Sequence, residues 1–148
     1  MKIYIGADHN GFTLKRQLAE FLAHSGYEVA DEGDEMLDPK DDFPQFAARV
    51  VAAMKASGDP DPRGILICGS GQGMCMAANR FKGIRASLVW DVQEARMSRN
   101  DDDANVLCLP ARTVKEADVE RIVRAWLTTG FAGASRFKRR IKEIDELV

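Results

Sequence analysis

The sequence predicts an α/β protein with a doubly wound, Rossmann-like sheet of five parallel strands, covered on both faces in a three-layer α/β/α arrangement with a C-terminal helix. Short apolar runs alternate with longer segments of helical periodicity along the whole chain. One run, Gly64–Cys68, is apolar on both faces, which is typical of a central parallel strand, and a glycine-rich loop follows it directly. The 148 residues fit one domain, which we expect to span 1–148.

Each element follows from a local pattern. Gly26 supplies a C-terminal cap to the first helix, and Pro44 suits the first turn of the second. Pro60 and Pro62 prevent regular structure after that second helix. The expected strands are residues 3–6, 27–30, 64–68, 84–90 and 106–109. The expected helices are residues 12–25, 44–54, 74–80, 92–99, 114–127 and 136–148.

Composition and charge exclude several classes of protein. With 45% hydrophobic and 30% charged residues, the chain is neither disordered nor collagen-like. A net charge of −2 does not indicate a nucleic-acid-binding surface, and no apolar run is long enough for a membrane helix. The N-terminus does not resemble a signal peptide. Three cysteines without a CxxC pair, and only two histidines, predict free thiols in a reducing cytoplasm and no metal site.

The segment Cys68-Gly69-Ser70-Gly71-Gln72-Gly73 lies at the carboxyl end of the predicted central strand, where ligands bind in open α/β sheets. Its glycines allow a tight turn, and its N–H groups favour an anion or a developing oxyanion. The spacing fits neither the GxGxxG dinucleotide fingerprint nor a phosphate-binding P-loop. The alternative is a glycine-rich turn without a ligand. The helix N-terminus and the glycine loop make Cys68 a candidate base or nucleophile, and the alternative is a small buried hydrophobic residue. We expect Cys75 and Cys108 to be ordinary core residues.

Two other segments carry polar groups suited to a site. Asp8 and His9 follow the first strand, and they share a crevice with Cys68 if the first and third strands are neighbours. The alternative makes Asp8 or Asn10 a helix cap and His9 an exposed loop residue. In the last helix, Arg136 and Arg140 are spaced i, i+4, so they share a face suited to phosphate. The alternative there is a solvated basic face.

Together these segments resemble the ribose-5-phosphate isomerase B family, which includes the galactose-6-phosphate isomerase subunits. The resemblance covers nearly the whole chain. It is carried by residues 6–12 (GADHNGF), 42–44 (DFP), 65–73 (ILICGSGQG), 77–80 (AANR), 83–86 (GIRA) and 105–107 (NVL), and by the Arg136/Arg140 pair.

The resemblance implies an aldose–ketose isomerase that acts on a phosphorylated sugar through a cis-enediolate, without a metal or organic cofactor. It implies that Cys68 moves a proton between C1 and C2, and that Ser70 assists ring opening. Backbone N–H groups of Gly69, Gly71, Gln72 and Gly73 would hold the enediolate oxygens, and Asp8 would contact sugar hydroxyls. The phosphate ligands it implies are His9, Arg112, Arg136 and Arg140.

The chain departs from the family pattern at two places. The family usually has a ring-opening histidine followed by asparagine where this chain has Asp101 and Asp102, and it often has tyrosine at Phe43. We expect conversion of ribose 5-phosphate to ribulose 5-phosphate, with Asp101 handling the ring and Asp102 contacting substrate. One alternative is the same chemistry on a tetrose 4-phosphate or hexose 6-phosphate, because that histidine is missing. Another is a non-catalytic sugar-phosphate-binding subunit, against which Cys68 argues. For Asp101 and Asp102 themselves, the alternative is a solvated helix end without a catalytic role.

The position of Asn100–Asp103 predicts an assembly. This segment connects a helix to the fifth strand, so it lies at the amino-terminal edge of the sheet, opposite the Cys68 pocket. We therefore expect a homodimer, or a tetramer, whose active sites are shared across the interface. We expect no nucleic-acid or membrane partner.

Overall fold

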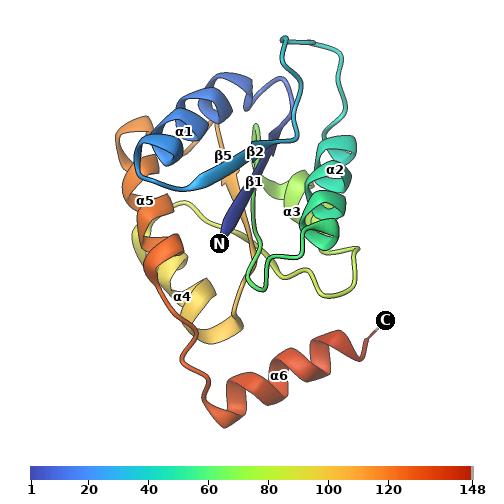
Figure 1. Ribbon diagram of the computed structural model, residues 1–148, viewed down its shortest axis with the longest axis vertical. Helices are drawn as coiled ribbons and strands as arrows, with labels where there is room; N and C mark the ends of the chain where they lie inside the picture. The colour runs from blue at the N-terminus through green and yellow to red at the C-terminus, as the bar shows by residue number, and fades with distance from the viewer. Residues whose placement is uncertain (148) are drawn as a thin grey trace.

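The computed structural model describes residues 1–147 and contains one five-stranded sheet of order β2-β1-β3-β5-β4 (Figure 1). All four strand pairings are parallel, as expected. The strands are β1 (Lys2–Ala7), β2 (Glu28–Asp31), β3 (Arg63–Cys68), β4 (Ala86–Leu88) and β5 (Val106–Pro110). The helices are α1 (Phe12–His24), α2 (Phe43–Ala56), α3 (Gln72–Ala78), α4 (Val92–Asp102), α5 (Glu116–Thr128) and α6 (Ser135–Asp145).

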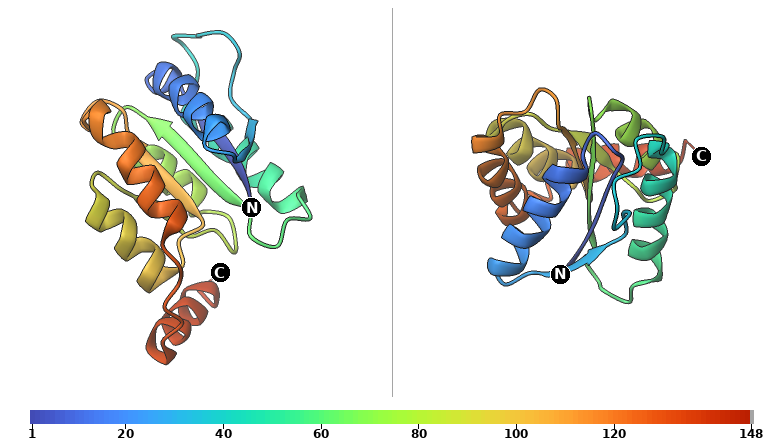
Figure 2. Two further views of the ribbon diagram at one scale, coloured as in Figure 1. Left: turned by 60° about the vertical axis from the view of Figure 1, so that its left-hand side comes forward. Right: turned by 90° about the horizontal axis from the view of Figure 1, so that it is seen from above.

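The predicted doubly wound, three-layer fold is confirmed. Helices α1, α4 and α5 cover one face of the sheet, and α2 and α3 cover the other (Figure 2). Side chains alternate between the layers: Ile65 and Ile67 pack toward α1 and α5, whereas Leu66 and Cys68 pack toward α2 and α3. Every residue of β3 is buried, as expected for a central strand.

The chain reverses its winding direction between β1 and β3. From β1 it passes through α1 to β2 on one side, and from β3 it passes through α3 to β4 on the other. The two strands are hydrogen-bonded neighbours, with Ala7 opposite Ile67, so the expectation that they adjoin is correct. The carboxyl ends of such a pair form the usual ligand-binding crevice of this fold.

Several predicted boundaries are wrong, and at the start of β4 a side chain replaces backbone pairing. The fourth strand is Ala86–Leu88 rather than 84–90, because the Asn105 side chain accepts the Arg85 N–H at 2.8 Å. Helix α3 begins at Gln72, two residues earlier than expected. Helix α4 continues to Asp102, so most of the predicted connection 100–103 is helical, and Asp103 ends the helix at φ 48°.

The last helix stands apart from the body of the molecule at the amino-terminal edge of the sheet (Figure 1). It packs against α4 and buries Phe137. It ends at Asp145, and the last residue of the predicted helix, Val148, lies outside the described residues. Among residues 1–147, no helix is long and apolar enough to cross a membrane.

Candidate active site

Cys68 ends β3 at the mouth of the glycine loop, with 5% of its surface exposed. Its Sγ accepts a hydrogen bond from the Gly71 backbone N–H at 3.1 Å. Gly71 adopts a left-handed conformation with φ 72°, and a Cβ there would lie 2.5 Å from Leu88 Cδ1. Only glycine fits this backbone and this space, so the loop geometry that directs an N–H at the thiol depends on Gly71.

Backbone donors cluster after this turn. The first hydrogen bond of α3 runs from Cys75 N to Gly71 O at 3.1 Å, so the N–H groups of Gln72 and Gly73 precede the helical ladder. Ser70 is exposed, and its Oγ lies 3.4 Å from Gln72 N. The Phe43 ring lies against Gly73, where a Cβ would come within 2.7 Å of the ring. Phe43 therefore covers the loop at Gly73.

Asp8 is buried at the end of β1, beside the glycine loop. Its backbone N–H donates to Ile67 O at 3.2 Å, and its Oδ1 accepts the Asn10 and Gly11 N–H groups at 3.0 and 3.3 Å. The side chain therefore holds the turn that leads into α1, although the residue before that helix is Gly11, not Asp8 or Asn10.

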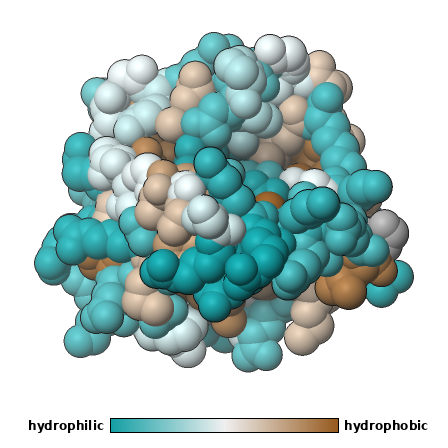
Figure 3. Space-filling model, turned by 90° about the horizontal axis from the view of Figure 1, so that it is seen from below, coloured by the Kyte–Doolittle hydropathy of each residue, from teal (hydrophilic) through white to brown (hydrophobic). Residues whose placement is uncertain are grey.

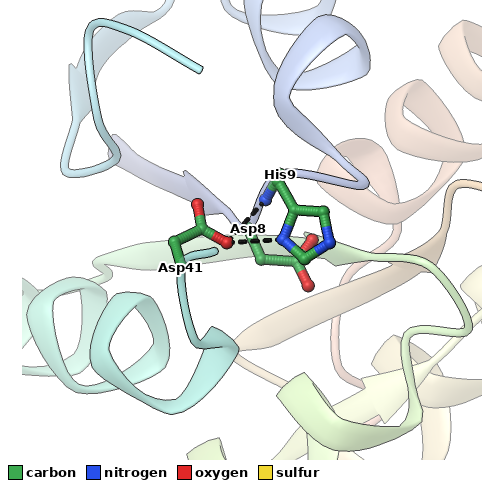
Figure 4. Close-up of side chains that lie close together, drawn as sticks. All are labelled: Asp8, His9 and Asp41. Atoms are coloured by element: carbon green, nitrogen blue, oxygen red, sulfur yellow. Dashed lines mark hydrogen bonds and ion pairs between the residues drawn. The ribbon is translucent and has the colours of Figure 1, made fainter. Parts of the chain in front are cut away.

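His9 forms a double contact with Asp41, a residue that the sequence analysis did not single out (Figure 4). One oxygen, Asp41 Oδ1, accepts the His9 backbone N–H at 2.9 Å and lies 2.7 Å from His9 Nδ1. This hydrogen bond is the main reason that the pKa of His9 is raised, and the charge of Asp8 adds to it, while burial and Arg112 lower it. The side-chain atoms of Asp8, His9 and Asp41 that could ligate a metal ion lie within 4.8 Å of one another.

Arg112 joins the ends of three strands. It follows β5, its backbone N–H donates to Gly69 O at 2.9 Å, and its guanidinium lies over Gly69. Its Nη2 donates to Asn10 Oδ1 at 3.1 Å. The structure thus brings Asp8, His9, the loop from Cys68 to Gly73 and Arg112 to one crevice. The Arg112 guanidinium and the His9 imidazole, whose pKa is raised, lie there beside a thiol and a cluster of N–H donors.

Comparison with known proteins identifies the family of this chain. Residues 3–144 match the family model described as Ribose/Galactose Isomerase. The chain belongs to the ribose/galactose isomerase family. It is 44% identical over 142 residues to the probable ribose-5-phosphate isomerase B of Mycoplasma genitalium, covering 96% of this chain and 92% of that protein. The family expected from the sequence is confirmed.

Solved structures of ribose-5-phosphate isomerase B share the fold of this family member. The Clostridium thermocellum enzyme is 43% identical with a TM-score of 0.93, covering 99% of this chain and 97% of that one. The Mycoplasma genitalium structure with bound ribulose 5-phosphate is 42% identical with a TM-score of 0.91, covering 98% and 94%.

The other predicted site residues of this isomerase-family chain lie at the opposite edge of the sheet. Asp101 and Asp102 end α4, and Arg136 and Arg140 lie on α6. The six residues of β3 separate the two edges by about 17 Å, at about 3.3 Å per residue. Burial and then the charge of Asp101 raise the pKa of Asp102, whereas Arg140 and Arg85 lower it, so Asp102 and Arg140 are neighbours.

The two remaining cysteines, Cys75 on α3 and Cys108 on β5, are neighbours. Cys108 is fully buried in β5, as expected. Cys75 is only partly buried, and its Sγ donates to Ala86 O at 3.2 Å. A hydrogen bond with Cys108 lowers the pKa of Cys75 to about 7, while burial raises the pKa of Cys108. The surroundings of Cys75 are therefore more polar than those of the core position that the sequence predicts.

Proposed function

We propose that this chain is an aldose–ketose isomerase that converts ribose 5-phosphate to ribulose 5-phosphate. The observation that carries the proposal is the Cys68 thiol, held by Gly71 N–H at 3.1 Å in the same crevice as Asp8, His9 and Arg112. The relatives named ribose-5-phosphate isomerase B support this substrate. A reducing, cytoplasmic setting suits an enzyme that depends on a free thiol.

The reaction moves hydrogen within the substrate. Cys68, as thiolate, takes the proton from C2 of the open-chain aldose. The C2–H electrons form the C1–C2 double bond of a cis-enediolate, while the π electrons of the C1 carbonyl move onto O1. The same thiol returns the proton to C1, while a proton passes from O2 to O1. No electrons leave the substrate, so the atoms balance without a cofactor. The N–H groups of Gly69–Gly73 hold the charged oxygens, and Asp8 holds sugar hydroxyls.

The phosphate end of the substrate meets positive charge. From one chain, Arg112 supplies a cation and His9 supplies an imidazole whose raised pKa favours its charged form. Hydrogen bonds to charged groups contribute about 1.5–3 kcal/mol each, so further cations would strengthen binding substantially. Arg136 and Arg140 supply them from a second copy, because their own chain holds them at the far edge of the sheet.

A homodimer, or a tetramer built from such dimers, brings the two edges together. The end of the molecule that carries α6 is mainly hydrophilic, with hydrophobic patches between the polar side chains (Figure 3). Large apolar side chains exposed on α4, α6 and the residues that follow α6 include Met97, Ile144 and Leu147. Their burial against a second copy would place Asp101, Asp102, Arg136 and Arg140 of that copy over the Cys68 crevice.

The aspartate at position 101 favours a second substrate class. Closed ribose 5-phosphate must be opened before C1 and C2 can react, and an acid–base group with a pKa near neutrality suits this step. The chain offers Ser70 in the crevice and Asp101 across the proposed interface. A tetrose 4-phosphate cannot close a furanose ring, because its C4 oxygen carries the phosphate, so it needs no opening.

The test is an assay of the purified chain with ribose 5-phosphate, erythrose 4-phosphate and a hexose 6-phosphate. Cys68→Ala protein, prepared in parallel, measures any contaminating isomerase. We expect ribulose 5-phosphate to form from ribose 5-phosphate only with the parent chain. Equal conversion by parent and Cys68→Ala, or none by either with every sugar phosphate, would contradict the proposal.

A further inference from the structure

The contact between Asp41 and His9 is the tightest polar contact of the crevice that the proposed mechanism leaves unused. The Asp41 side chain is 9% exposed, and its Oδ1 meets two nitrogens of one residue, the His9 backbone N at 2.9 Å and Nδ1 at 2.7 Å. Two bonds from one oxygen fix both the path of the chain and the rotation of the imidazole ring. Because a carboxylate only accepts, Nδ1 must carry a proton, which leaves Nε2 to meet a ligand.

We propose that Asp41 is a positioning residue that holds the His9 ring with Nδ1–H bound to the carboxylate and Nε2–H directed at the substrate phosphate. This inference rests on the proposed function, which places His9 among the phosphate ligands. Asp41 does not touch the substrate. It acts through His9 alone, in the way that a carboxylate orients the ring of a histidine in many sites.

The charges that face His9 come from three elements. Asp8 at the end of β1 and Asp41 in the loop 32–42 favour the imidazolium, and Arg112 after β5 opposes it. The outcome is a raised pKa, with the hydrogen bond from Asp41 as its largest cause. His9 therefore keeps its charge to higher pH than a free imidazole, whose pKa is about 6.5. Phosphate affinity that depends on this charge is present below the His9 pKa and is lost as the pH rises through it.

The chain itself holds Asp41 in place. Asp41 N–H donates to Asp38 O at 3.2 Å, and Phe43 begins α2 directly after the loop. A bare carboxylate so close to a phosphate site would repel the substrate. The Asp41 carboxylate favours phosphate binding only while it is paired with His9. The effects of substituting Asp41 and His9 on phosphate binding should therefore be strongly non-additive in a double-mutant cycle.

The first measurement is the titration of the His9 ring by nitrogen NMR, which is independent of turnover. His24, the other histidine of the chain, lies on α1 and serves as internal reference. We expect the His9 midpoint to fall in Asp41→Asn and to stay unchanged in Asp42→Asn, a neighbouring exposed carboxylate with no bond to His9 among residues 1–147. An unchanged His9 midpoint in Asp41→Asn overturns the proposal.

The second measurement follows KM and kcat for ribose 5-phosphate from about pH 6 to about pH 9, across the range in which histidine titrates. In Asp41→Asn we expect KM to begin rising at lower pH than in the parent, reaching roughly tenfold above it near neutrality, since one charged hydrogen bond is weakened. We expect kcat to stay within about twofold. In a His9→Gln background, Asp41→Asn should lower KM, because it removes an unpaired charge. Identical KM profiles of parent and Asp41→Asn overturn the proposal.

The test also separates this inference from the proposed function. Binding of inorganic phosphate, followed through the His9 ring signals, needs no turnover. If the parent turns over no sugar phosphate, the proposed function fails, and the inference stands or falls on whether phosphate affinity declines at lower pH in Asp41→Asn. Equal phosphate affinity of the two proteins at every pH counts against it.

Discussion

The two edges of the sheet differ in how their functional side chains are held. At the carboxyl edge, Asp41 holds His9, Asn10 holds Arg112, and Gly71 N–H holds the Cys68 thiol. At the amino edge, Arg136 and Arg140 are exposed on α6, and within residues 1–147 neither forms an ion pair. Hydrogen bonds within one chain therefore orient the side chains of the carboxyl edge, here the fixed edge. The two arginines of the amino edge, here the unfixed edge, have no carboxylate partner among those residues. This difference supports the proposed shared site, in which the unfixed edge of one copy completes the fixed edge of another.

The largest effect is expected from the fixed edge. Cys68→Ala should lower kcat by about 10²–10⁴, the usual contribution of a general base, and leave phosphate binding intact. The measurement is the exchange of the C1 and C2 hydrogens with solvent. Cys75→Ala is the matched control, because that thiol lies on α3 outside the crevice, and it should keep near-parental rates. Near-normal exchange in Cys68→Ala would remove this residue from the mechanism.

The next largest effect is expected from Arg140, and it tests whether the unfixed edge of one copy contributes to the active site of another. Arg140→Met should raise KM by roughly 10- to 150-fold, because it removes one charged hydrogen bond to phosphate. Co-expressed Cys68→Ala and Arg140→Met chains should recover about a quarter of parental activity at low substrate, since half of the randomly formed dimers then contain one intact site. Lys142→Met, also on α6, should change little.

The recovery distinguishes two arrangements of the site. If both edges belonged to one chain's site, no pairing of the two variants would restore activity. A mixture that never exceeds the sum of the separate variants would therefore contradict a shared site. So would a folded, fully active monomer in sedimentation at the assay concentration.

A smaller effect is expected from the acids that end α4. Asp101→His should raise kcat/KM for ribose 5-phosphate several-fold, because imidazole both donates and accepts near neutral pH. The value for erythrose 4-phosphate should stay unchanged, since that sugar has no furanose ring to open. Asp101→Asn serves as control for loss of charge alone. Efficient turnover of ribose 5-phosphate by the parent, unaltered in both variants, would show that this position does not limit ring handling.

The carboxyl edge could largely be predicted because its signals are local. The glycine loop follows an apolar strand, and Asp8-His9 follows another, so both segments had to lie at strand ends once the sheet was parallel. The doubly wound topology then made these ends neighbours. Asp41 could not be found this way. Its contact with His9 spans 32 residues, and it depends on the path of a loop whose sequence has no periodicity.

Side-chain contacts accompany two of the wrong boundaries, those of β4 and α4. The Asn79 side chain bonds both the N–H and the carbonyl of Ala86, and Asn105 occupies Arg85 N–H, so β4 is shorter than its apolar run. Arg99 donates to Asp103 Oδ1 and Ala104 O, both at 2.7 Å, which stabilises the extended end of α4. The Asn105 contact spans 20 residues and arises only in the folded chain, whereas Arg99 and Asp103 are spaced i, i+4, a local signal that could have extended the predicted helix.

A buried charge anchors the start of the loop 32–42, which carries Asp41 to the fixed edge. Lys15 of α1 is 1% exposed, and its ammonium donates to Asp31 Oδ1 at 2.9 Å and to Asp34 O at 3.0 Å. A lysine so deeply buried is found only where it is paired. Its two bonds tie α1 to the start of the loop that carries Asp41.

The smallest predicted effect follows from this anchor. Lys15→Met keeps the apolar stem but loses both bonds, and Asp31 can still be solvated, so the free energy of unfolding should fall by about 1–2 kcal/mol. For a chain of this length that corresponds to a Tm lower by roughly 2–8 °C. KM should rise modestly as Asp41 loses its fixed place, while kcat stays near the parental value. Lys40→Met, an exposed lysine in the same loop, should change neither quantity. An unaltered Tm in Lys15→Met would mean that the loop is held by its other contacts, such as the Arg49–Asp34 pair at 2.9 Å, and that the carboxyl edge owes its order to α2 rather than to α1.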